Sequence, residues 1–119
     1  MMVTYYGYAK CSTCQKAKKA LGQYDVSFKE VDITETPPSK TELKKILKSG
    51  EYALKDLFNK SGVQYRELNM KDKLPTLSQD EAIDLLASNG RLVKRPIVID
   101  GAKVTVGFKE DLFKKTWAS

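Results

Sequence analysis

The residues most suited to chemistry in this sequence are two cysteines, Cys11 and Cys14, which form a C-x-x-C motif. The chain contains no histidine, so it lacks the commonest general base and the commonest metal ligand. A Ser-His-Asp or Cys-His enzyme is thereby excluded. Two cysteines at this spacing are compatible with a zinc site, a structural disulfide or a redox-active dithiol.

These three interpretations differ in what else the chain must supply. A structural zinc site needs about four nitrogen or sulfur ligands, and one chain with two cysteines and no histidine lacks them. A structural disulfide across this spacing closes a loop too short to restrict the unfolded chain much, and a reducing compartment would open it. A redox-active dithiol needs only the right position in the fold. We therefore expect no bound metal and favour the redox interpretation.

The predicted elements around the cysteines support that choice. Residues 2–8 are rich in Val, Thr and Tyr and predict a strand, and apolar residues at helical spacing predict a helix from Cys14 to about Leu21. Cys11 then lies at or just before the helix N-terminus, where free N–H groups and the helix dipole stabilise a thiolate. We predict that Cys11 is the nucleophile and that Cys14, one turn inside the helix, resolves its mixed disulfides. Auxiliary roles at this site are assigned to Lys10, Ser12 and Thr13.

A second candidate for the site is Arg95-Pro96. In the fold predicted below, the proline begins a strand and faces the cysteine motif, where a cis peptide bond would present backbone groups to the site. An arginine beside it would stabilise the Cys11 thiolate and could bind an oxyanion in a forked geometry. The alternative is a surface arginine ahead of a strand, and the residues alone leave both interpretations open.

The remaining segments predict an α/β chain. Residues 26–33, 96–99 and 103–106 have the composition of strands, with a tight turn at Asp100-Gly101, and a last helix is predicted from about Lys109 to Trp117. Ser39 and Ser78 each open a predicted helix through a capping-box pattern. Residues 52–69 predict short helices, with Leu57, Phe58 and Leu68 among the apolar anchors.

The order is therefore β-α-β, a helical insert at about residues 39–90, and β-β-α. This order is that of a thioredoxin-like sandwich with a mixed four-stranded sheet. A length of 119 residues matches one domain, so we expect residues 1–119 to form a single domain. Aromatic residues expected in the core or at its rim are Tyr5, Tyr6, Tyr8 and Trp117.

Charge and hydropathy restrict the partners. The formal net charge is +6, from 21 Lys and Arg against 15 Asp and Glu, and only Arg66, Arg91 and Arg95 are arginines. Dispersed lysines are typical of a solvated surface, so the composition does not favour direct nucleic-acid binding. No apolar run is long enough for a membrane span, and residues 1–8 lack a basic leader and a cleavage site. We expect a cytoplasmic protein without a membrane segment.

The sequence resembles the arsenate reductase/Spx family across essentially its whole length, and it is most similar to small unassigned members that carry C-x-x-C. The resemblance rests on Tyr-x-Tyr-x-Lys-Cys-Ser-Thr-Cys at the motif, Thr36-Pro37-Pro38-Ser39, Lys94-Arg95-Pro96-Ile97-Val98-Ile99 and Val106-Gly107-Phe108. It implies a thioredoxin-like fold, no bound cofactor, and an external thiol donor, either glutathione with glutaredoxin or thioredoxin. It also implies mixed disulfides with that donor or with client proteins.

Two named branches of the family imply different activities. In the glutaredoxin-coupled arsenate reductases, Cys11 and Arg95 would be the nucleophile and one of three oxyanion-binding arginines, but Asn59 and Gly107 stand at the other two positions. In the Spx-type regulators, which bind the RNA polymerase alpha subunit, both cysteines form a redox switch. Ala53 stands here where those regulators have a glycine at the polymerase contact, and their chains continue beyond the last helix.

Overall fold

The chain forms two compact units in the computed structural model, which describes residues 2–101 and 103–118. The first, here the sheet unit, combines the chain up to Asp32 with the chain from Arg95 onward. The second, the helical unit, is Ile33–Lys94 and slightly exceeds the insert predicted for residues 39–90. That residues 1–119 act as a single domain stays a prediction.

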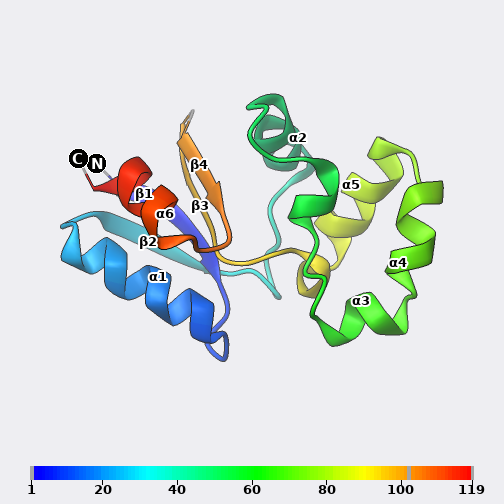
Figure 1. The fold of residues 1–119 in the computed structure, drawn as a ribbon, viewed down its shortest axis with the longest axis horizontal. Helices are drawn as coiled ribbons and strands as arrows, with labels where there is room; N and C mark the ends of the chain where they lie inside the picture. Colours follow the sequence, from blue (N-terminus) through cyan, green and yellow to red (C-terminus); the bar gives the residue numbers. More distant parts are fainter. Residues whose placement is uncertain (1, 102, 119) are drawn as a thin grey trace. The chain divides into compact units, whose positions relative to one another are not determined.

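The sheet unit contains one mixed four-stranded sheet (Figure 1). Its strands are β1 (Met2–Gly7), β2 (Ser27–Asp32), β3 (Ile97–Asp100) and β4 (Lys103–Val106), in the spatial order β2-β1-β3-β4. β1 is parallel to β2 and antiparallel to β3, and β3 is antiparallel to β4. Parallel neighbours need a crossover, which helix α1 (Ser12–Gln23) provides. The predicted thioredoxin-like sandwich is thus confirmed.

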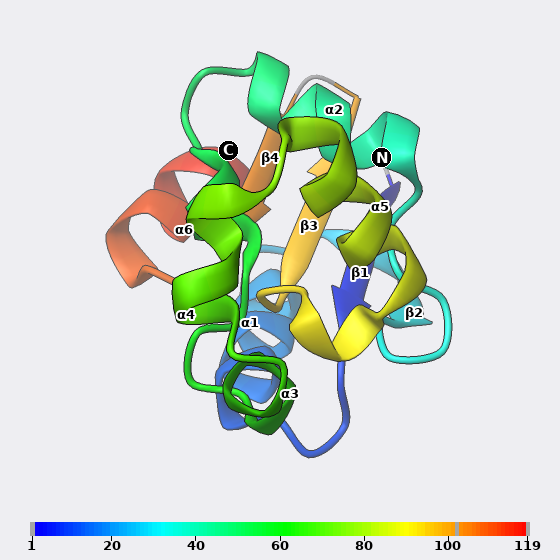
Figure 2. The ribbon, with the colours of Figure 1, turned by 90° about the vertical axis from the view of Figure 1, so that its right-hand side faces the viewer.

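The helical unit consists of short helices (Figure 2). In chain order they are α2 (Lys40–Lys48), η1 (Leu54–Leu57), α3 (Val63–Glu67), α4 (Met70–Lys73), η2 (Leu74–Thr76), α5 (Gln79–Ser88) and η3 (Gly90–Leu92). α2 and α5 begin at the predicted caps: the hydroxyls of Ser39 and Ser78 accept hydrogen bonds from Glu42 N at 3.2 Å and Glu81 N at 3.1 Å. The two helices pack against each other.

The prediction that Leu68 is an apolar anchor is wrong. Its side chain is exposed, whereas Leu57, Phe58 and Met70 are buried. The reason is local: α3 buries none of its residues, and Asn69 follows Leu68 with a left-handed φ of 51° that redirects the chain into α4. Met70 therefore occupies the interior in place of Leu68.

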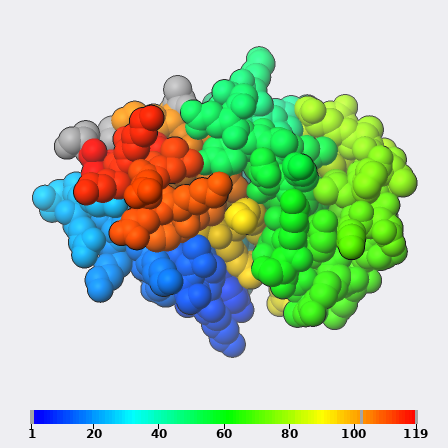
Figure 3. All heavy atoms as spheres, viewed as in Figure 1, coloured from blue at the N-terminus to red at the C-terminus, as the bar shows by residue number. Residues whose placement is uncertain are grey.

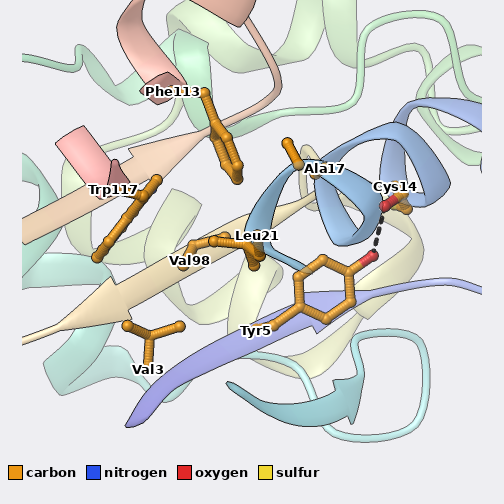
Figure 4. Close-up of a cluster of buried hydrophobic side chains, with 9 residues drawn as sticks. Val3, Tyr5, Cys14, Ala17, Leu21, Val98, Phe113 and Trp117 are labelled. Atoms are coloured by element: carbon orange, nitrogen blue, oxygen red, sulfur yellow. Dashed lines mark hydrogen bonds between the residues drawn. The ribbon is translucent and has the colours of Figure 1, made fainter. Parts of the chain in front are cut away.

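The core of the sheet unit lies between the sheet and two helices, α1 and α6 (Glu110–Trp117). Figure 3 shows these two helices side by side at the surface of this unit. Val3 and Tyr5 lie two residues apart on the same face of β1. They pack in one cluster with Leu21 of α1 and Trp117 of α6 (Figure 4). Trp117 donates its indole N–H to the Thr105 hydroxyl at 3.0 Å, so this large side chain is fully paired.

Among residues 2–101 and 103–118, no helix combines the length and the apolar character that crossing a bilayer requires.

Candidate functional site

Cys11 is the N-cap residue of α1, as the sequence predicts. Its backbone is extended, with φ −95° and ψ 115°, and its Sγ accepts a hydrogen bond from the backbone N–H of Cys14 at 3.2 Å. Cys11 N donates to the Tyr8 carbonyl at 3.1 Å, which fixes the loop that leads into the helix. The first turn of α1 contains no acidic residue. The positive end of the helix therefore acts on the Cys11 sulfur without a competing carboxylate.

Cys14 lies in a different environment only three residues away. Its side chain is fully buried in the core of the sheet unit, whereas Cys11 is partly exposed, and both are free thiols. Burial, together with the side-chain hydrogen bond to Cys11, raises the pKa of Cys14 to about 12. Hydrogen bonds from the Tyr8 backbone and the Tyr5 side chain act in the opposite direction. The two cysteines therefore combine one accessible sulfur with one thiol that is protected from solvent.

The contact of Tyr5 with the cysteine motif was not predicted. Its hydroxyl donates to the carbonyl oxygen of Cys14 at 3.0 Å inside the core (Figure 4). Tyr5 was expected only in the core or at its rim. The available signal was Gly7, two residues further along β1 and so on the same face, where the missing side chain leaves space for the tyrosine ring.

The peptide bond Arg95-Pro96 is cis. The guanidinium of Arg95 lies over the ring of Tyr8, with Cζ 5.1 Å from the ring centroid, a cation–π contact. Because the Tyr8 carbonyl accepts the N–H of Cys11, Tyr8 connects Arg95 to the cysteine loop. The buried Nη1 of Arg95 has no hydrogen-bond partner within the described part of the chain.

The auxiliary residues lie around Cys11. Lys10 and Ser12 are exposed and Thr13 is half-buried, and their roles stay predictions. The two positions expected to hold arginines in an arsenate reductase are split between the units. Asn59 belongs to the helical unit, where its N–H donates to Leu92 O at 2.7 Å. Gly107 belongs to the sheet unit, has a φ of 79° and donates its N–H to Pro96 O at 2.8 Å.

A metal centre is not evident at this site. Across residues 2–101 and 103–118, no group of three or more His, Cys, Asp or Glu side chains is placed to hold a metal ion.

Comparisons with known proteins identify relatives of this chain. The chain is 53% identical to the uncharacterized protein YusI of Bacillus subtilis over 118 residues, covering 99% of this chain and all of that protein. It is 34% identical to the global transcriptional regulator Spx of Streptococcus mutans over 110 residues, covering 92% of this chain and 79% of Spx. The structure of a possible arsenate reductase from Streptococcus mutans is 43% identical, with a TM-score of 0.85, covering 93% of this chain and 97% of that one. The ArsC family model matches residues 6–116, and the chain belongs to the ArsC family.

Proposed function

We propose that this protein is a thiol–disulfide oxidoreductase in which Cys11 is the nucleophile and Cys14 resolves the mixed disulfide. The observation that carries the proposal is the cap of α1. The partly exposed Cys11 Sγ accepts the N–H of Cys14 at the positive end of the helix, while the Cys14 side chain is fully buried. An accessible sulfur at the positive end of a helix, beside a protected second thiol, is what stepwise disulfide exchange requires.

The proposed reaction proceeds in two displacements. The Cys11 thiolate attacks a substrate disulfide, breaks its S–S bond, forms a mixed disulfide and releases one substrate thiolate. Cys14 then loses its proton to the substrate thiolate released in the first displacement and attacks the Cys11 sulfur, which forms the Cys11–Cys14 disulfide and releases the second substrate thiolate. The substrate gains two electrons and the protein loses two. Glutathione with glutaredoxin, or thioredoxin, returns the pair to the dithiol in this proposal.

Arg95 has a supporting role in the same proposal. Its guanidinium is held against Tyr8, whose carbonyl anchors the Cys11 N–H, and one buried N–H group of Arg95 is unpaired within residues 2–101 and 103–118. A permanently charged donor beside the cysteine loop would stabilise a thiolate or a bound oxyanion.

The test is a variant that stops the reaction after the first displacement. In Cys14→Ser, Cys11 forms mixed disulfides that the protein cannot resolve, so covalent partners accumulate and can be released with reductant and identified by mass spectrometry. Cys11→Ser is the control and should capture none. Equal recovery of partners with both variants would contradict the proposal.

A second candidate is a redox-switched transcriptional regulator of the Spx type that binds the RNA polymerase alpha subunit. The 34% identity to the Streptococcus mutans regulator Spx supports it. In this case the dithiol and disulfide forms should bind the alpha subunit with different affinity. Equal binding by the two forms in a pull-down experiment would contradict a switch.

A third candidate is arsenate reduction, which the similarity to the possible arsenate reductase from Streptococcus mutans supports. Asn59 and Gly107 provide no charge where arginines are expected, and each charge-assisted contact contributes about 1.5 to 3 kcal/mol. We therefore expect arsenate turnover to be weaker by several orders of magnitude than in a three-arginine site. Arsenate-dependent NADPH oxidation with glutathione and glutaredoxin measures it directly.

A further inference from the structure

We propose that the Tyr5 hydroxyl is a side-chain hydrogen-bond donor that stabilises the Cys14 thiolate during the resolving step. This inference rests on the proposed function, because it concerns the second displacement of that reaction. It assigns a chemical role to a residue of β1 that the motif does not include.

The Tyr5 ring is buried and confined by its neighbours. Its side chain is 1% exposed, and it packs against Phe28 of β2 with ring centroids 5.5 Å apart. A side chain at Gly7 would collide with it, because a Cβ there would lie 2.5 Å from Cε1 and Cζ of Tyr5 and would also contact the hydroxyl. Because Gly7 has no side chain, the Tyr5 ring can lie along the strand, and the Tyr5 hydroxyl reaches Cys14 on α1.

The hydroxyl is already hydrogen-bonded to Cys14. In the dithiol it donates to the Cys14 carbonyl at 3.0 Å. A phenolic hydrogen rotates about its C–O bond, so the same hydroxyl can turn to the neighbouring sulfur when that sulfur becomes charged. Burial raises the pKa of Tyr5 well above its ordinary value, so the group stays protonated and acts as a donor. The hydrogen bond from the Tyr5 side chain in turn lowers the otherwise raised pKa of Cys14.

The need for such a donor follows from the site itself. Cys14 is fully buried among Ala17, Leu21 and other apolar side chains, where a thiolate has no water to stabilise it. The resolving step nevertheless requires that thiolate: Cys14 S⁻ attacks the Cys11 sulfur, one S–S bond forms, the bond to the substrate sulfur breaks, and the substrate leaves as a thiolate. A fixed neutral donor stabilises the attacking anion without adding a buried charge.

The experiment separates the two displacements in time. The reduced protein is mixed with the aromatic disulfide 5,5′-dithiobis(2-nitrobenzoate), and release of the coloured thiolate is followed by stopped flow. The first equivalent reports attack by Cys11, and the second reports resolution by Cys14. Tyr5→Phe removes only the hydroxyl, and Tyr6→Phe, which removes a hydroxyl from the opposite face of β1, is the matched control.

We expect Tyr5→Phe to slow the second phase by about three- to tenfold and to leave the first phase unchanged. A hydrogen bond to a charged group changes the thiolate population by roughly ten- to a hundredfold, and the lower nucleophilicity of a stabilised thiolate offsets about half of this on a logarithmic scale. Tyr6→Phe should match the wild type in both phases. A second phase in Tyr5→Phe as fast as in the wild type would overturn the inference.

A second variant distinguishes donation from packing and covers the case in which Tyr5→Phe does not fold. Site-specific 3-fluorotyrosine at position 5 keeps the shape of the ring and makes the hydroxyl a stronger donor, so the second phase should be faster than in the wild type. An unchanged second phase with 3-fluorotyrosine would mean that the hydroxyl only supports packing, and would overturn the inference. Release of a single equivalent by the wild type would instead contradict the proposed function itself.

Discussion

The N-termini of α1 and α5 share one capping geometry and differ in the capping atom. In α1 the Cys11 sulfur accepts the N–H of the third helical residue at 3.2 Å, and in α5 the Ser78 hydroxyl does so at 3.1 Å. In α5 the side chain of Glu81 completes a capping box by accepting the Ser78 N–H at 2.9 Å, and this hydrogen bond lowers the pKa of Glu81. The first turn of α1 has no acid.

The difference shows what distinguishes a structural helix start from a reactive one. At α5 the positive end of the helix is neutralised by the chain's own carboxylates, Asp80 and Glu81, so it contributes to stability. At α1 the same positive end acts on a sulfur that can carry charge and form bonds. The backbone conformation is therefore common to both, and the side chains of the first turn determine the chemistry.

The largest effect is expected when the capping residue of α1 is replaced by the serine that caps α5. In Cys11→Ser the hydroxyl can still accept the Cys14 N–H, so we expect the same unfolding midpoint as the wild type. Disulfide exchange should fall by more than about a thousandfold, since a serine hydroxyl is not ionised at neutral pH and is a far weaker nucleophile. Exchange assays and thermal unfolding of the same sample measure both. Residual activity above a few per cent would contradict the assignment of Cys11.

The protected thiol gives a second large effect, visible at alkaline pH. Burial and the hydrogen bond with Cys11 together raise the pKa of Cys14 to about 12. Above the ordinary thiol pKa near 8.5, the unfolded chain releases this proton while the folded chain keeps it, so stability falls as the pH rises from about 8.5 to 12. Cys14→Ala should flatten this decline in urea unfolding of the reduced protein. Measurements between about pH 8 and 9 lie below most of the titration of tyrosines in the unfolded chain.

Cys11→Ala is the control for that experiment, since it removes the exposed thiol and leaves the buried one. Its stability should still decline over the same range of pH. A Cys14→Ala variant that declines as steeply as the wild type would show that the buried thiol does not cause the effect.

A smaller effect is expected when α1 receives the acid that α5 already has. Ser12 is exposed at the first helical position, and Ser12→Asp places a carboxylate there. The carboxylate should stabilise α1 by about 0.3 to 1 kcal/mol and repel the Cys11 thiolate, which should slow iodoacetamide alkylation at pH 7 by about three- to tenfold. Ser12→Asn is the uncharged control. Alkylation as fast in Ser12→Asp as in Ser12→Asn would contradict the electrostatic account.

The smallest effect is expected at α5. Ser78→Ala removes the capping hydroxyl and should cost about 1 kcal/mol of stability. Alkylation of Cys11 should be unchanged, because this cap belongs to the helical unit and carries no thiol. Chemical unfolding and alkylation kinetics together test whether the two helix starts are independent. A change in alkylation larger than twofold would show that they are coupled.

Much of the fold could be predicted from the sequence because its signals are local. Alternating Val, Thr and Tyr residues mark β1, Ser39 and Ser78 mark two helix starts, and Asp100-Gly101 marks the turn between β3 and β4. The segment after Ser61 was less predictable. Its short helices depend on a left-handed residue, Asn69, and on which apolar side chain reaches the interior, so Leu68 was assigned wrongly.

In the candidate site, too, one part could be predicted from the sequence and another part could not. Placement of Cys11 at a helix N-terminus followed from the order of elements, since a motif between a first strand and a first helix has few other positions. The contacts of Tyr5 with Cys14 and of Arg95 with Tyr8 could not be predicted in this way. Both depend on packing between different elements of the fold, and only the fold determines which groups meet there.

The most direct test of the central claim uses glutathione disulfide and intact-mass spectrometry on the reduced protein. If Cys11 attacks and Cys14 resolves, the wild type should finish lighter by two hydrogen atoms, with both glutathiones released. The Cys14→Ser variant should finish carrying one glutathione, on Cys11. A wild type that instead keeps glutathione, or that reacts at Cys14 first, would contradict the account.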